Sequence, residues 1–314
     1  LASAYELTTR NTASTNYCTG LSILLKILPT DMGDLGTLNE DYSSNGVDYT
    51  SGACIGPDMA GLVQDAADLK ASVGDCSDMS AATSIYTTAT RPQVHAAQGS
   101  LQSQVQALTG TNDAALDGLI MNALNGDGAF AGAAAAGADG CPARKEFIVK
   151  SLQNNLFNKM AINLAAAADA NSWARSQWIY WGYATPSLAP QATATKRANN
   201  YDTWASDGTA LANSKIADAY AMGTDEASMG EQASVVADQI TTTYIQATLR
   251  YLNKMDKDIA GGSATAGWKN QGEGWGFYKV IADYVGGADA SGASTLASAY
   301  ELTTRNTARS ARGD

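Results

Sequence analysis

Histidine and long apolar runs are nearly absent from this 314-residue sequence, and each absence excludes a class of protein. His95 is the only histidine, so the chain has neither a histidine-rich zinc site nor a recognisable histidine-based catalytic triad. The H-E-x-x-H, P-loop and Rossmann fingerprints are also missing. No apolar run approaches the roughly 20 residues that span a bilayer. We therefore expect a protein that is not an enzyme and has no membrane span, with His95 as a surface or structural residue rather than a ligand or general base.

Charged residues are scarce too, at 16% of the chain, and they are mostly acidic. Aspartate and glutamate number 31 against 20 lysine and arginine, which gives a formal net charge of −11. Such a chain repels nucleic acid and anionic membrane surfaces, whereas it attracts cations. A low charge content filled by alanine, glycine, serine and threonine is typical of secreted proteins.

The four cysteines show no C-x-x-C spacing and indicate two disulfides formed in an oxidising compartment, so we expect a secreted or cell-surface protein. Cys54 and Cys76 flank a predicted helix that begins at Pro57. A helix of about 16 residues separates its ends by about 24 Å, whereas a disulfide needs Cα atoms within about 7 Å. Two connectivities remain: Cys18 with Cys54 plus Cys76 with Cys141, or Cys18 with Cys76 plus Cys54 with Cys141.

An internal repeat defines the domain organisation. Leu1–Ala13, LASAYELTTRNTA, recurs letter for letter as Leu296–Ala308. An offset this long exceeds any solenoid period, so the repeated unit is a whole domain of a tandem-repeat protein. We expect 1–295 to be one repeat unit, with a candidate sub-boundary in the small-residue segment 125–140, and 296–314 to be the start of the next repeat or a C-terminal tail.

The fold predicted from these patterns is all-α, an irregular multi-helix bundle with a loop-rich, disulfide-tied N-terminal third. Its central element is a helix over 226–259, capped by Thr224 or by a Ser228–Glu231 capping box. One predicted buried stripe of this helix follows three- and four-residue spacings: Val236, Ile240, Tyr244, Ala247, Tyr251 and Met255. A second row, Ile245, Leu249, Leu252 and Ile259, predicts burial on nearly all sides.

Two further stretches have strong patterns. A long helix is predicted to begin at Pro142, and its apolar residues repeat every four positions: Ile148, Leu152, Leu156, Met160 and Leu164. The segment 171–183 concentrates tryptophan and tyrosine, which indicates either a wall of the core or an aromatic platform for carbohydrate.

Three stretches in the second half, 189–204, 243–256 and 271–285, together resemble the Fe-assimilating, low-iron-inducible periplasmic proteins of algae, which are related to the phytotransferrins. The resemblance implies a secreted or cell-surface protein of ferric iron uptake, with carbonate assisting metal binding. A histidine often precedes the E-G-W motif in that family, whereas Gln271 stands in this region here.

Ferric iron is a hard cation that prefers carboxylate and phenolate oxygens. The residues that can offer such oxygens in the resembling stretches are Tyr244, Tyr251, Asp256, Glu273 and Tyr278. Tyr244 and Tyr251 lie seven positions apart and therefore share a helix face. Lys196 and Arg197 form a cationic pair beside aromatic residues, which either holds an anion such as carbonate or belongs to a salt-bridged surface.

A second hypothesis is structural. Near-identical copies with low charge suit a subunit of an extracellular fibre, hair or surface layer. In this hypothesis the helix LASAYELTTRNT, present at both ends of the chain, packs into a neighbouring copy and joins the units head to tail.

Overall fold

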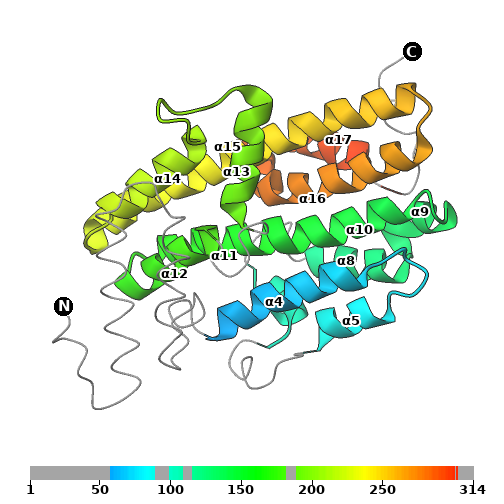
Figure 1. The fold of residues 1–314 in the computed structure, drawn as a ribbon, viewed down its shortest axis with the longest axis horizontal. Helices are drawn as coiled ribbons and strands as arrows, with labels where there is room; N and C mark the ends of the chain where they lie inside the picture. Colours follow the sequence, from blue (N-terminus) through cyan, green and yellow to red (C-terminus); the bar gives the residue numbers. More distant parts are fainter. Residues whose placement is uncertain (1–56, 89–98, 109–114, 182–188, 301, 303–314) are drawn as a thin grey trace. The chain divides into compact units, whose positions relative to one another are not determined.

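The computed structural model describes residues 57–88, 99–108, 115–181, 189–300 and 302, and nearly all of their regular structure is helical (Figure 1). The exception is an isolated antiparallel bridge between Trp204 and Ala210. The all-α prediction is therefore confirmed. His95, Cys18, Cys54 and most of the predicted loop-rich N-terminal third lie outside the described residues.

The helical elements follow one another along the chain with short connections. In order they are α4 (Pro57–Ser72), α5 (Ser80–Thr87), α7 (Leu101–Gln106), α8 (Leu116–Asn125), η2 (Gly128–Phe130), α9 (Ala131–Ala135), α10 (Cys141–Lys150), η3 (Ser151–Leu156), α11 (Phe157–Ala166), α12 (Ala170–Trp181), α13 (Pro190–Tyr201), α14 (Leu211–Met222), α15 (Glu226–Ala260), α16 (Ala264–Ala288) and α17 (Ala290–Tyr300). A search of the described helices finds none long and apolar enough to cross a membrane.

The chain divides into two compact units. The first is made of Leu1–Val63 with Met160–Ile240, and the second of Gln64–Lys159 with Thr241–Asp314. The divisions fall within α4, α11 and α15, whereas the predicted sub-boundary at 125–140 lies inside the second unit.

Aromatic side chains of α12 and α14 form the core of the first unit. The rings of Trp173 and Tyr220 meet edge to face with centroids 5.0 Å apart, and the Tyr180 hydroxyl donates to Asn213 Oδ1 at 2.7 Å. Trp173, Trp178 and Tyr180 are all buried. Of the two interpretations of segment 171–183, the structure supports the core wall, because these rings are not presented to a solvent-borne ligand.

The second unit is built around α16, which packs against α10, η3 and α17. Glycine permits this close approach to α10: a Cβ on Gly272 would lie 2.2 Å from the backbone oxygen of Ala143. Next to this contact, the rings of Phe130, Phe147 and Trp275 meet with centroids 4.8–5.2 Å apart. The small-residue segment 125–140 thus forms the short helices η2 and α9 and contributes Phe130 to the core.

A disulfide joins Cys76 to Cys141 with Cα atoms 5.7 Å apart. It ties the end of the α4 region to the start of α10. The first of the two predicted connectivities contains this pair, and its other pair, Cys18 with Cys54, lies outside the described residues.

Helix α15 matches the predicted central helix almost to the residue. All six residues of the first predicted stripe are buried, with exposures between 0% and 7%. The second row was predicted to be buried and is not: Ile245 and Leu252 are half-buried, and Leu249 is 54% exposed. Burial is therefore confined to one stripe rather than surrounding the helix.

The cap of α15 differs from the prediction by one turn. The backbone N–H of Ser228 donates to Asp225 Oδ1 at 2.9 Å, and the backbone N–H of Asp225 donates to Ser228 Oγ at 3.0 Å. This reciprocal pair is a capping box with aspartate as the first residue. The Ser228–Glu231 box was therefore the wrong choice, since Ser228 is the third residue of the box and not the first.

The helix predicted from Pro142 is present as a continuous run of α10, η3 and α11, but its middle is not α-helical. The segment η3 is a π-helix in which all six residues are buried, including Ser151, Gln153, Asn154 and Asn155. A π-segment within an α-helix accommodates an extra residue, and such segments are frequent at functional sites.

Candidate functional site

The predicted iron ligands Tyr244 and Tyr251 both lie against the ring of Phe277 in the second unit. The ring centroids of Tyr244 and Phe277 are 5.9 Å apart, and those of Tyr251 and Phe277 are 5.2 Å apart. The ammonium of Lys150 lies 5.7 Å from the centroid of the same Phe277 ring. We call these four residues, together with Glu146 and Glu273, the Phe277 cluster. It joins α15, α16 and α10.

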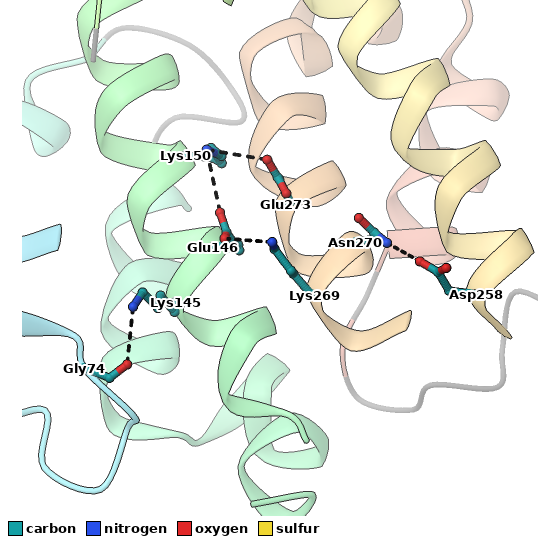
Figure 2. Close-up of polar contacts among 8 residues, drawn as sticks. All are labelled: Gly74, Lys145, Glu146, Lys150, Asp258, Lys269, Asn270 and Glu273. Atoms are coloured by element: carbon teal, nitrogen blue, oxygen red, sulfur yellow. Dashed lines mark hydrogen bonds and ion pairs between the residues drawn. The ribbon is translucent and has the colours of Figure 1, made fainter. Parts of the chain in front are cut away.

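Two carboxylates of the Phe277 cluster share one ammonium. Lys150 Nζ lies 3.6 Å from Glu146 Oε2 and 3.5 Å from Glu273 Oε1, so that carboxylates from α10 and α16 converge on it (Figure 2). Lys269 adds a second cation, 3.8 Å from Glu146 Oε1. The side chain of Glu273 is only 10% exposed, whereas that of Lys269 is 50% exposed. The Lys150–Glu273 pair is therefore better shielded from water than the Lys269–Glu146 pair. The Lys150 ammonium lies between the two carboxylates, in the position for which a metal cation would compete.

The hydroxyl of Tyr244 is held by two asparagines. It donates to Asn154 Oδ1 at 2.6 Å and accepts from Asn158 Nδ2 at 2.7 Å. Tyr244 and both asparagines are buried. Both hydrogen-bonding roles of this hydroxyl, donor and acceptor, are therefore used within the protein.

The π-segment beside Tyr244 contains further buried polar atoms. Within the described part of the chain, Ser151 Oγ, Gln153 Nε2, Asn158 Oδ1 and both amide atoms of Asn155 have no hydrogen-bond partner. Buried polar groups in folded proteins are nearly always hydrogen-bonded. Four of these five atoms belong to η3 and the fifth, Asn158 Oδ1, belongs to α11, so they lie on the two elements that contact Tyr244.

The hydroxyl of Tyr278 points to another part of the second unit. The hydroxyl of Tyr278 donates to the backbone oxygen of Ala293 on α17 at 2.9 Å, whereas Glu273 faces α10. Burial, with the nearby Asp283 carboxylate, raises the pKa of Tyr278 and so opposes its conversion to a phenolate. Asp256 is half-buried near the end of α15. Tyr244 and Tyr251 thus share the Phe277 ring and Glu273 pairs with Lys150 beside it, whereas the Tyr278 hydroxyl is bonded to α17.

The cationic pair that was predicted to hold an anion, Lys196 and Arg197, belongs to the first unit, and its two members differ in burial. Arg197 is buried at 5% exposure, whereas Lys196 is exposed on the adjacent side of α13. The two cations therefore do not form one exposed cationic patch.

Sequence reasoning did not identify Lys150, Phe277, Asn154 and Asn158 as members of this region. In the described residues, no group of three or more histidine, cysteine, aspartate or glutamate side chains is placed to hold a metal ion. A ferric site in this part of the chain would accordingly depend on tyrosine oxygens.

Comparison with known proteins gives no relative: no family model, no curated protein and no solved structure matches the chain.

Proposed function

We propose that the chain is a non-enzymatic, extracellular module of a tandem-repeat protein, and that it binds ferric iron through the Phe277 cluster. The observation that supports this most directly is that Tyr244 and Tyr251 lie against one ring, Phe277, beside Lys150, whose ammonium pairs with the carboxylates of Glu146 and Glu273. Phenolate and carboxylate oxygens are the donors that a hard trivalent cation prefers.

Charge and redox chemistry support the same proposal. The net charge of −11 favours the approach of a cation over that of an anion. The disulfide between Cys76 and Cys141 suits an oxidising compartment, where iron is present as Fe(III). Tyr244 and Tyr251 lie seven residues, or about two turns, apart on one face of α15, so both phenol side chains lie on the same side of the helix.

Lys150 provides a way to release iron in this proposal. Its ammonium and a ferric ion compete for Glu273, and the ion must displace the lysine before it reaches the carboxylate. Removing the positive charge of Lys150 should therefore strengthen iron binding, whereas removing an oxygen donor should weaken it.

The test is titration of the full chain with ferric nitrilotriacetate, with and without bicarbonate, while recording visible absorption. Iron bound to phenolate gives a charge-transfer band, and we expect this band to be lost in the Tyr244→Phe/Tyr251→Phe double variant. Tyr284→Phe is the matched control, because Tyr284 lies on α16 and is 59% exposed.

A native protein without any such band would contradict the proposal, as would a band that persists in the double variant. Lys150→Met should bind iron more tightly than the native chain, whereas Lys145→Met should not, since the half-buried Lys145 donates from its ammonium to the backbone oxygen of Gly74 instead (Figure 2). Dependence of the band on bicarbonate tests the carbonate component, and Lys196→Ala/Arg197→Ala tests the residues predicted for it.

A second candidate function is a structural subunit of an extracellular fibre, hair or surface layer, joined head to tail through the repeated terminal helix. One observation favours it: α17 ends with the first five residues of the second copy of the repeated segment, 296–300, and its Tyr300 is fully buried against α16. A repeated segment that is part of a core can connect one copy to the next.

Small-angle X-ray scattering on two fused copies tests this second candidate. A rigid head-to-tail connection predicts one preferred distance between the two copies. Independent motion of the two copies at all concentrations would contradict it, and would leave the iron proposal unaffected.

A further inference from the structure

The second copy of the repeated segment is anchored through its tyrosine and its second leucine. Tyr300, at the end of α17, and Leu302 each have 0% exposure. The preceding residues Leu296 and Ala297 are half-buried, and Ser298 is exposed. The segment is therefore held mainly at the A-Y-E-L end, by two side chains that are wholly inside the second unit.

Tyr300 is recognised by polar contacts as well as by packing. Its hydroxyl donates to the backbone oxygen of Thr248 at 2.8 Å, and its backbone oxygen accepts from Gln271 Nε2 at 3.4 Å. Its ring stacks on Tyr278 with centroids 6.1 Å apart and planes 21° from parallel. We call Thr248, Gln271, Gly274 and Tyr278 the Tyr300 site.

Gly274 makes the room that the Tyr300 ring occupies. A Cβ at Gly274 would lie 2.3 Å from Tyr300 Cε1 and 3.0 Å from Tyr251 Cβ. Both distances are well below a normal carbon–carbon contact, so any larger residue would push the ring out. The Tyr300 site therefore combines a hydroxyl acceptor, a stacking surface and a space that matches one phenol ring.

The first copy of the segment has the same side chains at the same spacing. Tyr5 and Leu7 correspond to Tyr300 and Leu302, and all thirteen residues of the two copies are identical. We propose that the Tyr300 site also binds Leu1–Leu7 of a second copy of this chain. The inference rests on the second candidate function and names its contact: the segment of one copy occupies the site of another.

Tethering decides which segment occupies the site in the isolated chain. The two segments have the same sequence and would offer the site the same side chains, so their effective concentrations at the site would distinguish them. Residues 296–300 are the end of α17, which follows directly after α16, and this gives them a high effective concentration, whereas a segment from another copy must compete in solution. Binding of the segment from a second copy becomes measurable once a substitution weakens binding of the chain's own segment and leaves the other segment unchanged.

The first experiment compares two full-length variants by sedimentation velocity over a range of protein concentrations. Tyr300→Ala removes the tethered ring but keeps Tyr5, and we expect it to self-associate as its concentration rises. Tyr5→Ala/Tyr300→Ala lacks both rings and should remain monomeric. Identical sedimentation of the two variants at every concentration would overturn the inference.

The second experiment does not depend on a variant that removes the ring from the core. Tyr300→Phe retains the ring but loses the bond to the Thr248 oxygen, so the site remains filled by a weaker occupant. A fluorescent LASAYELTTRNTA peptide should bind this variant in a saturable way and at least tenfold more tightly than the same peptide with alanine in place of tyrosine. Absence of any difference between the two peptides would also overturn the inference.

Peptide binding and the scattering experiment on two fused copies test the Tyr300 site and the structural function separately. Peptide binding by Tyr300→Phe combined with free motion in the two-copy scattering experiment would support the Tyr300 site and contradict the structural function. Rigid fused copies with no peptide binding would show that the copies are joined by another surface, which overturns the inference alone.

Discussion

The Tyr244 hydroxyl donates a hydrogen bond to Asn154 Oδ1 at 2.6 Å across 90 residues of sequence. Asn158, one α-helical turn later, donates to the same hydroxyl at 2.7 Å. All three side chains are buried. This contact fixes α15 against the π-segment, so it determines both the stability of the second unit and the position of a proposed ligand.

Replacing Tyr244 by phenylalanine should destabilise the protein. The substitution keeps the ring but leaves buried amide groups of Asn154 and Asn158 without the hydroxyl. Loss of one partner of a buried hydrogen bond costs about 1–3 kcal/mol. The free energy of unfolding, measured by urea denaturation and followed by circular dichroism, should fall by that amount in Tyr244→Phe. Tyr284→Phe should be within about 0.5 kcal/mol of the native value, as is usual for exposed positions; equal stability of the two variants would contradict the buried contact.

Replacing Gly272 by alanine should also destabilise the protein, although alanine favours helices. The new Cβ would lie 2.2 Å from the backbone oxygen of Ala143, and backbone cannot move aside as a flexible side chain can. Overpacking of this kind costs about 1–3 kcal/mol. Thermal or urea unfolding of Gly272→Ala gives the measurement.

Gly286→Ala is the matched control on the same helix. A Cβ there meets no atom within 4 Å, so only the helix preference acts, and the variant should gain up to about 1 kcal/mol. We therefore expect Gly272→Ala to lower the free energy of unfolding and Gly286→Ala to raise it. A stabilised Gly272→Ala would show that α10 and α16 are further apart than the structure places them.

Removing the disulfide should lower stability because it constrains the unfolded chain. Cys76 and Cys141 enclose a separation of 65 residues. The chain-entropy treatment gives about 4 kcal/mol for a loop of this length. Cys76→Ser/Cys141→Ser should therefore unfold at a lower urea concentration than the oxidised native chain. The native chain after reduction should resemble the variant, and no change on reduction would contradict the prediction.

Acid should destabilise the protein through its helix caps. Hydrogen bonds from Ser228 lower the pKa of Asp225, and hydrogen bonds from Gly292 and Ser291 lower the pKa of Asp289. A carboxyl with a folded-state pKa below its unfolded value of about 3.9 stabilises the fold above that pH and loses its contribution as the pH falls through the folded pKa. The free energy of unfolding should therefore decrease with falling pH below about 4. In Asp225→Asn/Asp289→Asn the decrease should be shallower, because asparagine does not titrate; an unchanged slope would contradict the role of these two caps.

Helix α15 could be predicted from the sequence because the pattern that indicates it lies within the helix itself. Val236 to Met255 recur at three- and four-residue spacings, and each of these stripe residues is buried. The second row was predicted by hydrophobicity alone, which does not say whether a neighbouring helix covers that side. Leu249 is an example: none of the elements that the structure describes covers its position on α15, and no local pattern reveals that.

The strict four-residue spacing of apolar residues from Ile148 onward is a sequence indication of the π-segment. An α-helix turns by about 100° per residue, so apolar residues spaced strictly by four drift by about 40° at each step. Ile148, Leu152 and Leu156 have this spacing and are nevertheless all buried, because the wider π-turn between them compensates for the drift. Beyond the segment the burial moves to Ala161 and Ala165, which the four-residue pattern did not predict.

The candidate site was only partly predictable for a related reason. The shared face of Tyr244 and Tyr251 follows from their spacing within one helix. Their partners Asn154, Lys150 and Phe277 come from other helices, and contacts across such distances depend on how the helices pack rather than on any local pattern.

The π-segment makes the length of this stretch adjustable. Deleting one residue between Ser151 and Leu156 would let the run from α10 continue as an ordinary α-helix, and because a π-segment absorbs one extra residue locally, α11 would keep nearly the same rotation about the helix axis. Asn158 would therefore stay on the side of the Tyr244 hydroxyl, whereas a deletion in the α-helical turns of α10 would rotate everything after it by about 100°. Variants of this chain that differ in length should accordingly carry their insertions and deletions inside the π-segment rather than in the α-helical turns beside it.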